Sequence, residues 1–142
     1  FNPVPYPLLN VHLGNEFPIF NQWSFSLMNF FEFVSDEYVS LRLEHHFDGF
    51  LFNKLPLLQK LKWRAVVNVN SVWGQVSDEN VALIPPDQIT VKSLNEQPYV
   101  EVGYGIENIF RVVRVEMFHR LNYLDDPNVN KWGIKIGFRF GL

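Results

Sequence analysis

The sequence predicts an all-β protein, arranged as an antiparallel up-and-down meander of six or seven long strands. The main signal is alternation with a period of two residues, because successive side chains of a strand point to opposite faces. Tyr38–Phe47 is one example, since Val39, Leu41 and Leu43 each lie between polar neighbours, and Lys131–Leu142 shows the alternation most cleanly. No stretch has the helical period of a parallel crossover, so we expect consecutive strands to pair as antiparallel hairpins.

Similar alternation recurs along most of the chain. Strands are expected over Trp23–Val34, Lys60–Trp73, Pro98–Ile106, Val113–Tyr123 and Lys131–Leu142, with a weaker element around Leu8–Leu13. Turn-forming residues between them predict short connections at Ser35–Glu37, Glu107–Asn108 and Asp125–Asn130, and a long polar loop over Gly74–Gln97.

Composition excludes several classes of protein. A net charge of -3 and a pI near 5.8 give no basic footprint for nucleic acid. The absence of cysteine excludes disulfides, thiol catalysis and zinc-thiolate sites. The chain begins at Phe1 without an initiator Met or a leader-like segment, so we expect residues 1–142 to be the C-terminal fragment of a longer chain.

The two faces of the predicted strands differ in a way that favours a membrane β-barrel. Aromatic residues make up 16% of the chain, and Trp23, Phe47, Trp73 and Trp132 lie near predicted strand ends, where aromatic girdles of membrane barrels occur. The opposite face carries charges of both signs. We therefore predict the C-terminal part of a transmembrane outer-membrane β-barrel, with lipid against the apolar face. Closure needs about eight strands, so further strands must come from upstream sequence or another chain.

Charged residues on the opposite face are the candidate functional residues. They form a predicted lumen-facing network of Arg42, Glu44, His46, Lys62, Arg64, Glu101, Arg114, Glu116, Arg120, Lys135 and Arg139. The network either lines a conduction path or fills the interior with ion pairs, and we favour the second, since side chains fill small barrels. Glycines on the same face, at 103, 105, 133, 137 and 141, are expected to allow curvature or close approach by an interior plug.

The last predicted strand ends in a pattern of its own. Ile134, Ile136, Phe138, Phe140 and Leu142 alternate to the C-terminus and resemble the β-signal that barrel-insertion machinery recognises, with Leu142 where Phe or Trp is more usual. A periplasmic C-terminus would place Ser35–Glu37, Gly74–Gln97 and Asp125–Asn130 outside the cell. Asp48–Gln59 and Glu107–Asn108 would then face the periplasm.

No catalytic or cofactor-binding pattern emerges from the chain. Glu44, His45 and His46 are the nearest approach to a metal cluster, but adjacent histidines on a strand point to opposite faces. We predict no metal site, no cofactor and no enzymatic activity; an envelope enzyme would rest on little beyond Glu44, His46 and the other interior charges.

Longer segments of the sequence resemble a known family. They are VPYPLLNVHLGNE (4–16), MNFFEFVSDEYVSLRLEHHFDG (28–49), LFNKLPLLQKLKWR (51–64), PYVEVGYGIENIFRVVRVEMFHRLNYL (98–124) and KWGIKIGFRF (131–140). Together they resemble the C-terminal barrel of an uncharacterised outer-membrane family of Bacteroidetes-type bacteria, in which a carboxypeptidase-regulatory-like β-sandwich precedes the barrel. The resemblance implies a bacterial outer-membrane location and an additional N-terminal region, and it implies no activity.

Two hypotheses about function follow. The favoured one is a barrel segment of an outer-membrane protein that serves transport, assembly or envelope integrity. The alternative is a soluble small β-barrel that binds an apolar ligand. They differ in which face is buried: a membrane barrel exposes its apolar face and encloses its charges, whereas a soluble barrel does the reverse.

Overall fold

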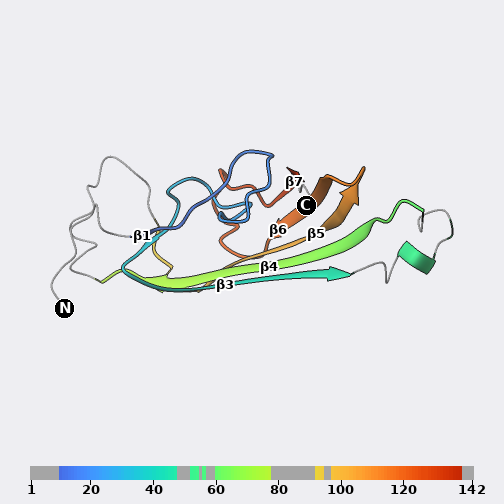
Figure 1. Ribbon diagram of the computed structural model, residues 1–142. Helices are drawn as coiled ribbons and strands as arrows, with labels where there is room; N and C mark the ends of the chain where they lie inside the picture. The colour runs from blue at the N-terminus through green and yellow to red at the C-terminus, as the bar shows by residue number, and fades with distance from the viewer. Residues whose placement is uncertain are drawn as a thin grey trace.

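The computed structural model describes residues 10–47, 52–54, 56, 60–77, 92–94 and 97–138. Its main element is a five-stranded antiparallel sheet in the order β3-β4-β5-β6-β7 (Figure 1). The strands are β3 (Glu37–Phe47), β4 (Arg64–Gln75), β5 (Tyr99–Ile109), β6 (Val113–Arg120) and β7 (Trp132–Phe138). A two-stranded sheet pairs β1 (Asn10–Val11) with β2 (Val34–Ser35), and Phe52–Lys54 forms the short helix η2. The predicted all-β antiparallel meander is confirmed; the sheet itself is not closed into a barrel.

The predicted strand over Trp23–Val34 is wrong. Only its last residue lies in a strand, and Phe25 and Phe33 each make a single isolated bridge. Two physical causes are visible. Phe31 has a φ of 57°, which interrupts an extended chain, and the amides of Ser26 and Leu27 donate to a side chain of the sheet instead of to a neighbouring strand.

Other strand ends differ from the expected ones. β4 begins at Arg64 rather than Lys60, because Lys62 has a φ of 53° and lies in a turn. β5 runs to Ile109, past the turn predicted at Glu107–Asn108, and its register with β6 shifts between Ile106 and Ile109. The reversal follows at Phe110 to Val112. Of the weak element around Leu8–Leu13, only β1 is found among the described residues.

Residues 10–35, which we call the inner segment, cover one face of the five-stranded sheet. Figure 1 shows this blue to cyan segment on one side of the curved sheet. Phe25, Met28 and Phe33 of the inner segment pack with Val72 and Tyr99 of the sheet in one buried cluster. The small hydrophobic core therefore lies between the inner segment and the sheet.

The covered face is the charged one. We call it the polar face; it carries Glu101, Glu116, Arg114, Arg120 and Lys135, each no more than 5% exposed. The other face, which we call the apolar face, is open in the described structure. Its exposed side chains include Val39, Leu41, Leu43, Trp73, Tyr104, Trp132, Ile134, Ile136 and Phe138. Burial is thus reversed relative to a water-soluble sheet, in which apolar side chains are inside.

Candidate functional site

Glu101 holds the middle of the inner segment to the sheet. One carboxylate oxygen accepts hydrogen bonds from the Ser26 amide at 2.7 Å and the Asn70 side chain at 2.9 Å. The other accepts from the Leu27 amide and the Tyr99 hydroxyl, both at 2.9 Å. Because the carboxylate is fully buried, these four donors replace the water it loses.

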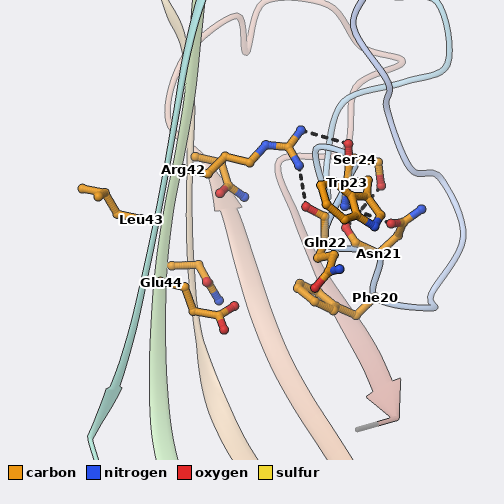
Figure 2. A pocket seen from close by; sticks show the side chains of 10 residues that line it. Phe20, Asn21, Gln22, Trp23, Ser24, Arg42, Leu43 and Glu44 are labelled. Atoms are coloured by element: carbon orange, nitrogen blue, oxygen red, sulfur yellow. Dashed lines mark hydrogen bonds between the residues drawn. The ribbon is translucent and has the colours of Figure 1, made fainter.

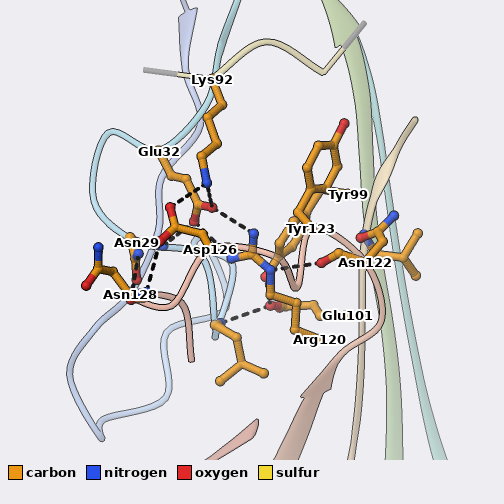
Figure 3. Close-up of polar contacts among 12 residues, drawn as sticks. Asn29, Glu32, Lys92, Tyr99, Glu101, Arg120, Asn122, Tyr123, Asp126 and Asn128 are labelled. Atoms are coloured by element: carbon orange, nitrogen blue, oxygen red, sulfur yellow. Dashed lines mark hydrogen bonds and ion pairs between the residues drawn. The ribbon is translucent and has the colours of Figure 1, made fainter. Parts of the chain in front are cut away.

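Arg120 makes a second attachment, to Glu32 of the inner segment. The guanidinium donates two hydrogen bonds to the two carboxylate oxygens at 3.0 and 2.7 Å, and both side chains are buried (Figure 3). Its plane also lies against the Tyr99 ring, 4.9 Å from the centroid. Paired, stacked geometry of this kind suits arginine and not lysine.

Lys92 extends this attachment towards the connection between β6 and β7. Its ammonium lies 2.8 Å from Asp126 and 3.8 Å from Glu32, and its backbone amide donates to the Glu32 carbonyl at 2.8 Å. Hydrogen bonds from Lys92 and from the Asn128 amide lower the pKa of Asp126. The Glu32 end of the inner segment is therefore held by two separate stretches of chain.

Lys135 and Arg42 attach the inner segment through its backbone carbonyls. The Lys135 ammonium donates to the carbonyls of Asn15 and Phe17 at 2.6 and 2.5 Å. The Arg42 guanidinium donates to those of Gln22 and Trp23 at 2.5 and 3.0 Å (Figure 2). Strands β3, β5, β6 and β7 thus each supply a charged side chain that binds the inner segment.

A further group of charges lies on the polar face, nearer to the β5–β6 turn. Arg114 contacts Glu44 at 2.7 Å and Glu116 at 2.5 Å, while Asn68 donates to Glu116. Both ring nitrogens of His46 are engaged, one by Glu44 at 2.6 Å and one by Glu107 at 2.8 Å. The Phe20 ring lies 4.4 Å from the Arg114 guanidinium and covers it from the side of the inner segment.

A cavity of about 320 Å³ lies between the inner segment and this group of charges (Figure 2). Its lining includes Phe20–Ser24 on one side and Arg42, Glu44, Asn68 and Asn70 on the other. The lining combines charged and amide side chains with the aromatic residues Phe20 and Trp23, and its charged groups have partners in the protein. The cavity is therefore large enough for water or a small solute, and its charges are already engaged.

The structure places most of the predicted network on one face. Arg42, Glu44, His46, Glu101, Arg114, Glu116, Arg120 and Lys135 lie there with the contacts given above, and Arg64 starts β4 on the same face. Lys62 was placed wrongly, since it lies in the turn before β4. Arg139, Phe140 and Leu142 lie outside the described residues. Ile134, Ile136 and Phe138 lie exposed on the apolar face.

Sequence reasoning missed the partners from the inner segment. Glu32, Phe20 and the backbone groups between Asn15 and Leu27 were assigned to a strand or to no element. One signal for Glu32 was present, because it is a lone carboxylate inside the aromatic run Phe30 to Phe33, and a buried carboxylate needs a cationic partner. No comparable signal identifies backbone carbonyls as ligands.

Two glycines of the polar face lie against large side chains. A Cβ on Gly137 would lie 3.2 Å from Phe20 of the inner segment, and one on Gly103 would overlap the Phe118 ring of β6. Gly141 lies outside the described residues. We expect Gly103→Ala to destabilise the fold by about 1–3 kcal/mol, because the fully buried Phe118 ring must move. Denaturant unfolding would measure it.

Gly133→Ala is the matched control for that substitution. Its Cβ would meet only the end of the Leu27 side chain, at 3.0 Å, and that end can rotate away. Equal unfolding midpoints for the two alanine variants would contradict the packing argument at Gly103.

His12 makes the inner segment sensitive to acid. Its side chain is buried, lies 3.0 Å from the Ser35 hydroxyl through Nε2, and burial lowers its pKa from the ordinary 6.5 to about 4. The unfolded chain binds this proton below about pH 6.5 and the folded chain only near pH 4. Its contribution to stability is therefore complete above pH 6.5 and is lost as the pH falls towards 4.

We expect His12→Gln to remove this part of the pH dependence, because glutamine offers an amide nitrogen at a similar reach and does not titrate. The measurement is the unfolding midpoint at pH 7 and at pH 4.5 for both proteins. An equal loss of stability on acidification in both would assign the effect to other groups.

Within the described ranges, no cluster of three or more His, Cys, Asp or Glu side chains has the arrangement of a metal site. No helix in those ranges is long and apolar enough to cross a membrane.

Fold and site together define a class: an antiparallel β-sheet protein whose charged face binds a segment of its own chain. Over residues 6–80 the chain matches the C-terminal domain of a family of unknown function (DUF5686), and it belongs to that family. The expectation of an uncharacterised family is therefore confirmed. No curated protein matches the chain, and no solved structure does.

Proposed function

We propose that this chain is part of an outer-membrane β-barrel whose interior is filled by the inner segment. The observation that carries the proposal is the reversed burial of the sheet. Five charged side chains of the polar face are buried, whereas Val39, Leu43, Ile134 and their neighbours on the apolar face are exposed. A surface of this kind in water would be a liability for aggregation, and in a bilayer it is the expected lipid contact.

The dimensions of the strands support the same proposal. β4 has 12 residues, and β3 and β5 have 11 each. At about 3.3 Å per residue and a tilt of about 40°, such strands rise about 28–30 Å, which is the thickness of the hydrocarbon layer. Trp73, near one end of the sheet, and Trp132, at the same end of β7, lie exposed on the apolar face, where interfacial aromatic residues are common.

The proposal requires further strands. Among the described residues, β3 is one edge of the sheet. The outer side of β7, the other edge, is paired there only with Pro18–Phe20, through the Ile136 amide and carbonyl. In lipid, unpaired edges are too costly, so upstream strands are proposed to close the barrel. The insertion machinery would recognise the Ile134, Ile136 and Phe138 side of β7. A preceding carboxypeptidase-regulatory-like domain and a Bacteroidetes-type host belong to the same proposal.

The attachment of the inner segment to the polar face favours a filled interior over an open pore. The polar-face charges bind protein groups, so they fill the interior instead of lining an open path. A non-catalytic role in envelope integrity or assembly, or in transport that first displaces the inner segment, fits this arrangement. The soluble alternative is less well supported, because its apolar ligand would have to enter an interior occupied by Glu101, Glu116 and Arg120.

Spin labels on single introduced cysteines test the proposal, since residues 1–142 contain no cysteine. In the full-length protein, we expect a label at Leu43→Cys to collide mainly with oxygen, which concentrates in lipid. A control label at Asn128→Cys, in the exposed β6–β7 connection, should collide mainly with a water-soluble nickel chelate. Nickel accessibility at position 43 equal to that at position 128 would favour the soluble alternative.

A further inference from the structure

One end of the sheet carries an exposed basic cluster. Lys60 and Lys62 lie in the turn that leads into β4, and Arg111 lies in the turn between β5 and β6. All three are exposed. The Asn108 side chain donates to the Lys62 carbonyl at 2.7 Å, so the two turns lie side by side. We call these three residues the basic end.

Among the described residues, no acidic side chain forms an ion pair with Lys60, Lys62 or Arg111. Glu107, the acid nearest to it in the sheet, is buried and faces His46 at 2.8 Å. The opposite end of the sheet is different. It carries the acids Asp36, Glu37, Asp125 and Asp126 together with Lys92 and Lys131. The sheet is thus electrostatically asymmetric along its strands.

Exposed apolar side chains accompany the basic residues. Phe110, in the β5–β6 turn, is 88% exposed, and Leu61, between the two lysines, is 47% exposed. Trp63 follows Lys62 in the sequence, and its ring centroid lies 6.3 Å from that of Phe52 in η2. Basic residues interleaved with aromatic and aliphatic ones, directly beyond an apolar face, are typical of a surface at a membrane boundary, where Lys and Arg reach headgroups and rings sit at their level.

We infer that the basic end binds the headgroups of anionic phospholipids in the leaflet next to the β5–β6 turn. The inference rests on the proposed function, because it needs the apolar face to be in lipid. Each Lys or Arg near an anionic surface strengthens association by about fivefold. Exposed charges of one sign attract a surface of the opposite charge, and added salt screens this attraction.

Spin-labelled lipids test the inference on the full-length protein in phosphatidylcholine bilayers. Electron spin resonance measures the fraction of labelled phosphatidylglycerol or labelled phosphatidylcholine that is immobilised at the protein surface. We expect the wild-type protein to prefer phosphatidylglycerol by about threefold to fivefold at low salt, with the preference falling as salt is added.

A triple variant, Lys60→Ser, Lys62→Asn and Arg111→Asn, should bring this preference close to one. Asparagine is chosen at 62 and 111 because both residues have positive φ, 53° and 70°, which asparagine tolerates. The charge-retaining triple, Lys60→Arg, Lys62→Arg and Arg111→Lys, should keep the preference. So should Lys131→Ser, which removes a lysine at the opposite end.

The outcomes separate the inference from the proposed function. Two results would overturn the basic end as a headgroup site: equal immobilisation of both lipids by the wild-type protein, or an unchanged preference in the neutral triple variant. In either case, the presence of immobilised lipid would still support a barrel. Absence of immobilised lipid of either kind overturns the membrane proposal, and this inference with it. Unchanged immobilisation of phosphatidylcholine shows that the triple variant remains folded.

Discussion

Replacement of Glu101 by glutamine is expected to loosen the inner segment and to destabilise the protein by about 2–6 kcal/mol. The change keeps the shape of the side chain but turns one acceptor oxygen into a donor. Whichever way the amide is oriented, two of the four donors, Ser26 N with Asn70 or Leu27 N with Tyr99, lose their acceptor. Each buried donor left without a partner costs about 1–3 kcal/mol.

Two measurements check this expectation. Denaturant unfolding gives the change in stability, and hydrogen exchange at the Ser26 and Leu27 amides reports release of the inner segment itself. Glu37→Gln is the matched control, because Glu37 is exposed and its one described side-chain partner is Gln75 at 3.2 Å. A surface change of this kind should stay within about 0.5 kcal/mol. Similar stability and exchange in both variants would mean that Glu101 does not hold the inner segment.

An arginine in the middle of the apolar face is expected to cost about 2–4 kcal/mol. Leu43 lies near the centre of β3 and is 56% exposed. In water, replacement of an exposed leucine by arginine would change stability little. At the middle of a bilayer the same replacement removes a charge from water, and in membrane barrels the cost has this size.

Val39→Arg is the control on the same strand and the same face. Position 39 is two residues from the start of β3 and about 13 Å along the strand from position 43, so it would lie near the interface. The cost there should be at most about 1 kcal/mol. Unfolding of the full-length protein from lipid vesicles measures both variants. Equal costs at the two positions would contradict a depth-dependent, lipid-facing surface.

The long hairpins of the sheet could be predicted from the residue pattern. In β3 to β7 the side-chain period of two is imposed by the backbone, and each face meets one kind of environment over its whole length, so the pattern survives in the residues. For the same reason it identified most charges of the polar face. The strand ends were less certain, because Lys62 and Asn108 take positive φ values that their residue types permit but do not require.

The groups that the charged face binds follow from contacts between segments far apart in the sequence. Residues 23–34 alternate as a strand would, yet they lie across Glu101, a residue distant in sequence whose carboxylate accepts hydrogen bonds from the Ser26 and Leu27 amides. Backbone carbonyls are chemically the same at every position, so no residue pattern predicts which of them a charged side chain will bind. This holds for Lys135 with the carbonyls of Asn15 and Phe17, and for Arg42 with those of Gln22 and Trp23. Local periodicity determines which way a side chain points, and the partner it meets there depends on how the whole chain packs.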